Sequence, residues 1–271
     1  MPRDNKQPPI TGPLPNPGNR APFEAILFDL GNTLIYFDGK FPEVFEQGDA
    51  EMLRQLRSAG FDPGGDAFLR EFRSRVESYQ AECDDEFIEF TTHYILRTLL
   101  DEWGYSYIPN AVLRAALDAR YSVSRAYWQP EPDTAHTLEW LREQGYRLGL
   151  ISNAGDDADV QALVDKAGIR HYFRVIATSA ALEIRKPNPR IFHWVLQRLG
   201  TRPDQAAMVG DTLGADILGA QNAGLYSIWI TRRADNAANR AHQDTIHPDA
   251  KIEALSELPA LLHQLSVKAK G

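Results

Sequence analysis

Short apolar runs alternate with longer helical stripes along most of the chain, and this alternation predicts the fold class. Ala25 to Phe28 form an apolar run that ends at Asp29, and Arg147 to Ser152 form another. A short run that is apolar at nearly every position indicates a strand buried on both faces, as in a parallel sheet covered by helices. From Thr134 onward such strands alternate with helical patterns. We therefore expect an α/β fold with a Rossmann-like, doubly wound parallel sheet as its core.

Residues 41 to 128 have a helical pattern throughout and contain no predicted strand. Large apolar side chains recur there at steps of three and four, which places them on the inner faces of helices. Gly39 on one side and Pro130 and Pro132 on the other predict two chain crossings. We expect an all-α helical bundle at 37–130, inserted as a cap domain into an α/β core domain made of 23–36 and 131–271.

Two polar segments are predicted to lie outside the packed core. Residues 1–22 contain five prolines between Pro8 and Pro17 and little apolar surface, which is typical of a disordered tail. A proline-rich ligand for a partner domain is the alternative interpretation of this tail. The run from Arg232 to Thr245 is expected to be a surface loop.

Composition limits the cellular compartment and the classes of binding partner that we expect for the protein. The 271 residues are 43% hydrophobic and 24% charged, enough to bury a sizeable core, and their formal net charge is −8. This acidic balance argues against nucleic acid or an anionic membrane as a partner, because both require a basic face. The single cysteine, Cys83, cannot form an internal disulfide, and no signal segment or long apolar span opens the sequence. We expect a cytoplasmic protein.

Polar residues follow the predicted strands at the points where chemistry is expected. Asp29, Ser152 with Asn153, and Asp211 follow three apolar runs, Asp216 follows five positions later, and Lys186 precedes a helix start. The carboxyl ends of parallel strands meet at one edge of a sheet, where ligands bind. Taken singly, these residues are a strand-end aspartate, a helix cap or a surface lysine. Only the occurrence of all these residues together, at strand ends and helix starts, indicates an active site.

This order of Asp, Ser, Lys and paired Asp resembles the four signature motifs of the haloacid dehalogenase (HAD) superfamily, over residues 24 to 265. The resemblance implies a helical cap inserted after the first motif and a Mg²⁺-dependent phosphomonoester hydrolase that acts on a small phosphorylated metabolite. It also implies that Asp29 attacks phosphorus and becomes a transient aspartyl phosphate, which divides one difficult displacement into two easier ones.

The same resemblance assigns the remaining roles. Asp29, the carbonyl of Gly31, Asp211 and Asp216 would form the Mg²⁺ site, in which Asp216 is expected to orient a metal-bound water or Lys186 rather than to bind the metal directly. A helix-start aspartate favoured by the helix dipole is the alternative for Asp216. The implied catalytic set is Asp29, Ser152 and Lys186, and the implied phosphate-binding groups are Ser152, Lys186 and the backbone N–H groups of Gly31, Asn32 and Asn153. Arg185 is assigned no role.

One position departs from the usual phosphatase pattern. Most phosphatases of the superfamily carry a second aspartate two residues after the nucleophile, in an Asp-x-Asp pattern, and use it as general acid and base. This chain has Gly31 at the corresponding position. General acid–base assistance is typically worth about 10²–10⁴-fold, so its loss should slow esters with poor leaving groups. A cap residue, a substrate hydroxyl or a metal-bound water are conceivable substitutes.

Several alternatives remain open from the sequence. A 2-haloacid dehalogenase would use Asp29 to attack carbon without a metal, although the Asp211 and Asp216 pair resembles a metal site. A phosphate-binding or regulatory module with weak catalysis is suggested by Gly31, and a phosphonate-cleaving enzyme or phosphomutase is also open. Arg97, His93 and Tyr94 are guesses for substrate specificity. The sequence leaves a monomer and a homodimer equally open.

Overall fold

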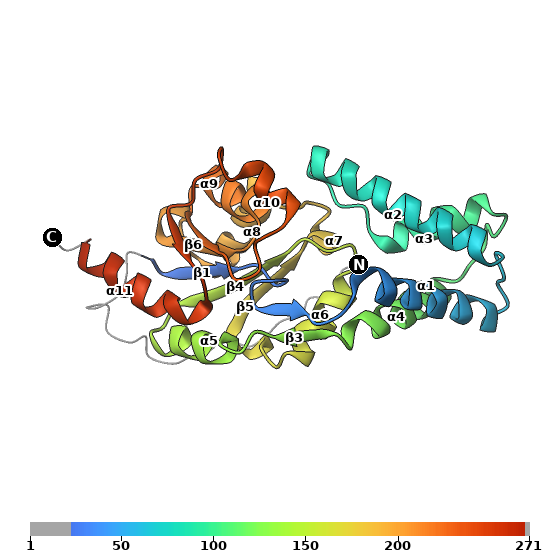
Figure 1. Ribbon diagram of the computed structural model, residues 1–271, viewed down its shortest axis with the longest axis horizontal. Helices are drawn as coiled ribbons and strands as arrows, with labels where there is room; N and C mark the ends of the chain where they lie inside the picture. The colour runs from blue at the N-terminus through green and yellow to red at the C-terminus, as the bar shows by residue number, and fades with distance from the viewer. Residues whose placement is uncertain (1–22, 269–271) are drawn as a thin grey trace.

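The protein core is a single parallel sheet with helices on both faces. The computed structural model describes residues 23–268, and of residues 80–86 it describes only the backbone. Six strands form the sheet in the order β5-β4-β1-β6-β7-β8, and every neighbouring pair is parallel. The predicted doubly wound α/β class is confirmed (Figure 1). The strands are β1 (Ala25–Phe28), β4 (Arg147–Ser152), β5 (Phe173–Thr178), β6 (Ala206–Gly210), β7 (Tyr226–Ile230) and β8 (Ala250–Ile252).

The alternation of side chains along β1 sends them into two separate apolar layers. Ile26 and Phe28 pack in one layer, and Ala25 and Leu27 pack in the layer on the opposite face of the sheet. Successive side chains of a strand point to opposite faces, so a strand with helices on both sides is apolar at every position. The first layer contains side chains of α5 (Thr134–Glu143), α6 (Asp157–Lys166) and α11 (Leu258–Lys268), and the second those of α8 (Pro189–Leu199) and α9 (Leu218–Asn222).

The register of the sheet brings the ends of three strands together. β1 lies between β4 and β6, with Ala25 opposite both Arg147 and Ala206. All three strands run in the same direction, so the residues that follow them lie at the same edge. This edge is where Asp29, Ser152 and Asp211 are found.

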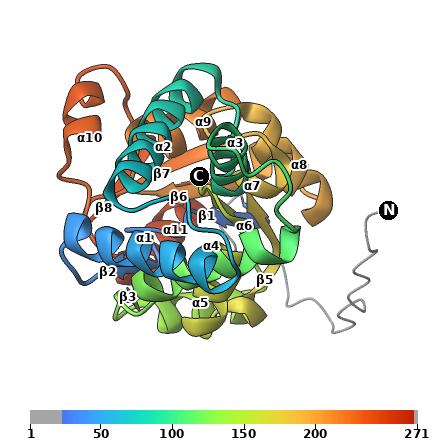
Figure 2. The same ribbon diagram turned by 90° about the vertical axis from the view of Figure 1, so that its right-hand side faces the viewer.

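Four helices form a second unit beyond that edge. They pack around an apolar cluster of their own, which includes Met52, Phe68, Phe72, Leu96 and Leu117. Figure 2 looks onto this end of the molecule and shows the four helices in front of the sheet. We propose that this unit is the cap expected from the sequence, with the boundaries given above. The helices are α1 (Phe41–Ser58), α2 (Asp66–Glu86), α3 (Thr92–Glu102) and α4 (Asn110–Arg125).

A two-stranded antiparallel ribbon joins the helical unit to the core, and it was not predicted. β2 (Ile35–Phe37) pairs with β3 (Trp128–Pro130), with Tyr36 opposite Gln129. The ribbon is three residues long on each side, and strands this short leave no periodicity in the sequence. Both chain crossings therefore run side by side.

The expectation of a loop from Arg232 to Thr245 was wrong in part. A short helix, α10 (Ala237–His242), lies within this run and starts at Asn236, whose side chain accepts a hydrogen bond from the Asn239 amide N–H. The buried residue of this helix is Asn239, so no apolar stripe announces it. The remaining short helix of the core is α7 (Ser179–Leu182). The predicted tail, 1–22, lies outside the described residues.

No helix within residues 23–268 is both long enough and apolar enough to cross a membrane.

Candidate active site

Lys186 brings two aspartates from distant parts of the sequence together. Its ammonium nitrogen lies 2.6 Å from Asp29 Oδ1 and 2.7 Å from Asp216 Oδ1, and it also donates to the carbonyl of Ile151 at 2.9 Å. All three charged side chains are buried. The predicted convergence of lysine and aspartates at one edge of the sheet is therefore seen in the geometry.

A tight turn after β1 fixes the position of Asp29. The Asp29 amide donates to Val209 O at 3.0 Å and so continues the pairing with β6, and the chain then turns back so that Leu34 N donates to Leu30 O at 2.9 Å. Asn32 occupies the left-handed region at φ 57° and its amide donates to Ile35 O at 2.6 Å. The Asn32 N–H is engaged within the turn in this conformation, contrary to the expectation that it is free for phosphate.

Asn153 holds the backbone of Lys186 in place. Its Oδ1 accepts from Lys186 N and its Nδ2 donates to Lys186 O, both at 2.9 Å. This paired contact joins the loop after β4 to the segment before α8 and directs the lysine inward. The sequence suggested the Asn153 backbone as a phosphate ligand but gave no sign of this positioning role. Ser152, at the end of β4, is buried beside it.

A glycine makes room for Asp216. Asp216 lies in the π-helical turn Leu213–Ile217, and its Oδ2 accepts from Thr212 N at 2.9 Å. A Cβ atom on Gly210 would lie 2.3 Å from Asp216 Cγ, so a side chain at this position would displace the carboxylate. Both oxygens of Asp216 are hydrogen-bonded, one to Lys186 and one to Thr212. This agrees with the expectation that Asp216 orients Lys186.

The backbone of Asp211 is held from outside the cavity. Trp229 Nε1 and Asn239 Nδ2 each donate to the Asp211 carbonyl at 2.8 Å. Asn239 also accepts from Leu213 N at 2.8 Å. Helix α10, which the sequence analysis did not predict, thus holds the backbone of Asp211 through Asn239.

The three acids together carry more negative charge than the lysine offsets. Burial raises the pKa of Asp29 to about 6; the positive charge of Lys186 opposes this effect and the negative charge of Asp216 adds to it. Burial, together with the charges of Asp29 and Asp216, raises the pKa of Asp211 to about 8. Burial alone would lower the pKa of Lys186, but the charges of Asp216 and Asp29 raise it above its ordinary value. A further cation would relieve this excess.

The donor atoms suit a small, hard cation. One carboxylate oxygen from each of Asp29, Asp211 and Asp216 lies within 4.8 Å of the other two. Mg²⁺ prefers oxygen ligands and is often held by one or two carboxylates together with water. The residues present therefore fit the metal that the sequence pattern implies.

All the residues predicted to bind metal or phosphate or to act in catalysis line one cavity of about 510 Å³. It lies between the strand ends and the ribbon and helices that cover them. The set comprises Asp29, Gly31, Asn32, Ser152, Asn153, Lys186, Asp211 and Asp216.

Among the lining residues that the sequence analysis did not single out are Trp128 and Asp159. The indole of Trp128 lies 3.5 Å from the position of a Cβ atom on Gly31. Asp159, in the first turn of α6, has a pKa raised to about 7 by burial, although Arg125 Nη1 lies 3.4 Å away and opposes the effect. Asp159 belongs to an acidic run at a helix start, which normally indicates only a favourable interaction with the helix dipole.

The guesses about specificity residues were poor. Arg97 lines a different cavity, of about 270 Å³, together with Thr98 and Asp101. Neither His93 nor Tyr94 is among the residues that line the cavity of Asp29. Periodicity identifies helices but not which of their polar side chains face a distant loop.

The fold and site together define an α/β protein with an acidic, lysine-bridged centre, and comparison with known proteins places it in a family. The family model of haloacid dehalogenase-like hydrolases matches residues 23–224, so the chain belongs to this family. A glyceraldehyde 3-phosphate phosphatase from Methanopyrus kandleri is 31% identical over 245 residues, which cover 90% of this chain and 98% of that protein. The predicted enzyme class, a HAD hydrolase of the phosphatase type, is confirmed.

Solved structures confirm the fold but include both chemistries of the family. A HAD phosphatase from Thermococcus onnurineus is 27% identical, with a TM-score of 0.59 over 89% of this chain and 98% of that one. A 2-haloacid dehalogenase from Pseudomonas syringae pv. Tomato DC3000 is 26% identical, with a TM-score of 0.62 over 89% of this chain and 99% of that one. Fold similarity alone therefore does not separate phosphoryl transfer from dehalogenation.

Proposed function

We propose that the protein is a Mg²⁺-dependent phosphomonoester hydrolase that acts through an aspartyl-phosphate intermediate on a small phosphorylated metabolite. The observation that carries this proposal is the contact between Lys186 and Asp29 beside a second acid, Asp211, in one buried cavity. A metal-independent attack on carbon does not need Asp211 as a metal ligand. The phosphatase relative from Methanopyrus kandleri supports the same chemistry.

Asp29 is the proposed nucleophile. Its carboxylate oxygen forms a bond to phosphorus while the bond from phosphorus to the ester oxygen breaks. The electron pair leaves on the ester oxygen, which takes a proton from water to become the alcohol. Water then attacks the phosphorus of the acyl phosphate, which releases inorganic phosphate and regenerates the carboxylate. Lys186, 2.6 Å from Asp29 Oδ1, keeps this carboxylate ionised and offsets negative charge as the phosphoryl group approaches.

The other polar groups have binding and orienting roles in this proposal. The Ser152 hydroxyl donates to a phosphoryl oxygen, with the backbone N–H groups of Gly31 and Asn153 as further donors. Asp29, Asp211 and the Gly31 carbonyl would hold Mg²⁺, and Asp216 holds Lys186 in position at 2.7 Å. When bound, Mg²⁺ supplies positive charge that offsets the phosphoryl oxygens.

The experiment is turnover of p-nitrophenyl phosphate with and without Mg²⁺, for the wild type and Asp29→Asn. The p-nitrophenolate leaving group needs little protonation, so the glycine at position 31 does not mask activity. We expect hydrolysis that requires both Mg²⁺ and Asp29. Equal rates in the two proteins would contradict the proposal.

A second candidate is a 2-haloacid dehalogenase, favoured by the structural similarity to the Pseudomonas syringae enzyme. In that reaction Asp29 attacks carbon and displaces halide, with no metal needed. Chloride release from chloroacetate in the presence of a chelator would support it. If calorimetry shows tight binding of phosphorylated metabolites while a broad panel shows neither reaction, the protein is a phosphate-binding module instead.

A further inference from the structure

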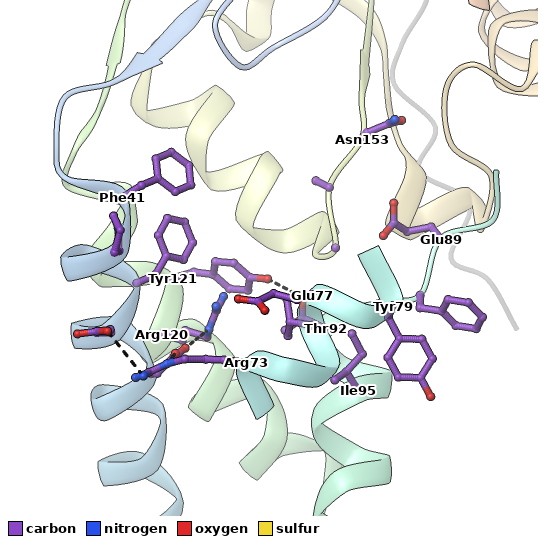
Figure 3. A pocket seen from close by; sticks show the side chains of 18 of the residues that line it. Phe41, Arg73, Glu77, Tyr79, Glu89, Thr92, Ile95, Arg120, Tyr121 and Asn153 are labelled. Carbon is purple, nitrogen blue, oxygen red and sulfur yellow. Dashed lines mark hydrogen bonds and ion pairs between the residues drawn. The ribbon is translucent and has the colours of Figure 1, made fainter. Parts of the chain in front are cut away.

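A second cavity, of about 480 Å³, adjoins the one that contains Asp29. It lies among α1, α2, α4 and the loop that follows β4 (Figure 3). The two cavities have six lining residues in common, so they lie side by side. These residues are Phe41, Phe45, Tyr121, Asn153, Ala154 and Arg185.

Aromatic side chains form two walls of this second cavity. Phe41 and Phe45 of α1 stack with their ring centroids 4.8 Å apart and their planes at 18°. Tyr79 of α2 and Phe90 pack at 4.9 Å. Figure 3 shows Phe41 and Tyr79 on opposite sides, with Tyr121 between them. We call this cavity the aromatic pocket.

The aromatic pocket offers exposed aromatic surface on which a ligand can pack. Phe41 is 54% exposed although it is a large apolar residue. Concave sites of about 300–1,000 Å³ that are rich in aromatic side chains are typical of small-molecule binding, and this pocket combines its aromatic walls with charged side chains. A planar ring placed between such walls gains both burial and stacking.

Three arginines and four carboxylates line the aromatic pocket, so the lining has no excess of positive charge. Asp49 lies 2.7 Å from Arg73 Nε and 2.7 Å from Arg120 Nε. Arg185 Nη1 lies 3.6 Å from Glu89 Oε2. Each arginine that lines the pocket thus faces a carboxylate, and Glu46 and Glu77 add further negative charge to the lining. This arrangement favours an uncharged leaving group over one with a second phosphate.

We propose that the aromatic pocket binds the leaving group of the substrate, and that this group is uncharged and carries a planar aromatic or heteroaromatic ring. A nucleoside 5′-monophosphate is a compound of this class. The inference rests on the proposed phosphatase function, since Asp29 must hold the phosphoryl end. A triose phosphate would fill only the cavity of Asp29 and leave the aromatic pocket without contacts.

Two matched pairs of esters test the preference for a ring. Uridine 5′-monophosphate is compared with ribose 5-phosphate, and 2-phenylethyl phosphate with ethyl phosphate; within each pair both leaving groups are primary alcohols. We expect kcat/KM to be about ten- to a hundredfold higher for the ester with the ring, the range expected when a base stacks on an aromatic side chain. Equal values within both pairs would overturn the inference, while hydrolysis itself would uphold the proposed function.

Variants of Phe90 test whether the preference for an ester with a ring arises in the aromatic pocket. Phe90→Leu keeps apolar volume but removes the ring, and Phe90→Ala removes both. We expect the ratio within each pair to fall towards one in Phe90→Ala and to fall partly in Phe90→Leu. Tyr107→Ala is the control, because Tyr107 is an aromatic residue of the helical unit that is 95% exposed and does not line the pocket. An unchanged ratio in Phe90→Ala would overturn the inference.

Binding without turnover separates this inference from the proposed function. Calorimetric titration of Asp29→Asn with uridine 5′-monophosphate and with ribose 5-phosphate should show about tenfold tighter binding or more for the nucleotide. Adding Phe90→Ala should remove that difference. If the nucleotide binds more tightly but no ester is hydrolysed by the wild type, the pocket is upheld and the phosphatase proposal fails. Equal binding of the two ligands would overturn the pocket.

Discussion

The ammonium of Lys186 lies 2.6 Å from the carboxylate of Asp29, although 157 positions separate the two residues. Asn153 holds the backbone of Lys186, and Asp216 holds its ammonium at 2.7 Å. The lysine is therefore positioned before any substrate arrives, and the electrostatic environment of Asp29 is built into the fold.

Lys186→Met should destabilise the protein and abolish activity. The change leaves the carboxylates of Asp29 and Asp216 buried without their cation, and breaking a buried ion pair typically costs about 3–5 kcal/mol. The cost requires ionised carboxylates, so we expect it to be larger at pH 8 than at pH 5. Urea unfolding at both pH values measures it.

The double variant Lys186→Met/Asp216→Asn provides the control for that prediction. It removes one of the two stranded charges, so part of the lost free energy of unfolding should return at pH 8 while activity stays absent. If Lys186→Met alone is as stable as the wild type at pH 8, the ion pairs of Lys186 with Asp29 and Asp216 contribute nothing to the free energy of unfolding.

Gly210→Ala should impair catalysis through Asp216. The new methyl group would lie 2.3 Å from Asp216 Cγ and must push this side chain away from Lys186. Small displacements in an active site can cost up to about 100-fold in rate, so we expect a drop in kcat/KM of at least about tenfold. Gly65→Ala is the matched control, because its Cβ would meet only Arg57 Nη2 at 3.9 Å. Equal effects of the two changes would refute the role of Gly210.

Asp159→Asn should stabilise the protein, and more so as pH rises. The pKa of Asp159 is raised from 3.8 to about 7, mainly by burial, so the folded state disfavours the ionised form. The resulting cost is absent below pH 3.8, grows as pH rises towards 7 and is constant above it, on the order of 4 kcal/mol. Melting temperatures of both proteins from pH 5 to pH 8 test this. A gap between them that does not widen with pH would count against the raised pKa.

Gly31→Asp should change the dependence of rate on the leaving group. A Cβ atom at this position would lie 3.5 Å and 3.8 Å from the Trp128 ring, which is ordinary contact, so the substitution fits. An acid here could protonate a poor leaving group, an effect typically worth about 10²–10⁴-fold when the geometry is right. We expect alkyl phosphates to gain more than p-nitrophenyl phosphate, with Gly31→Ala as the control. A uniform change in both rates would exclude proton donation by the new residue.

The sequence predicted the core of the site because that part depends on local patterns. The apolar run of β1 leads directly to Asp29, and those of β4 and β6 lead to Ser152 and Asp211. Parallel strands place such residues at one edge whatever the details of packing. The lysine before α8 followed from the family pattern and lies where that pattern implies.

Features that depend on packing between distant segments could not be predicted. Asn239 supports Asp211 from within a polar run, so no apolar stripe marks its helix. Trp128 and Asp159 reach the cavity only because the ribbon and α6 are placed beside it. The aromatic pocket has the same origin, since Phe41 and Tyr79 face each other only through the relative placement of α1 and α2, which helical periodicity does not encode.

Trapping the intermediate tests the central claim most directly. The wild type is mixed with substrate and Mg²⁺, quenched in acid within one turnover, and digested for mass spectrometry. The account predicts a phosphoryl group on Asp29 that appears only with substrate and is absent from Asp29→Asn. Rapid turnover by the wild type without a phosphoryl group on Asp29 would contradict the account, and so would undiminished activity in Asp29→Asn.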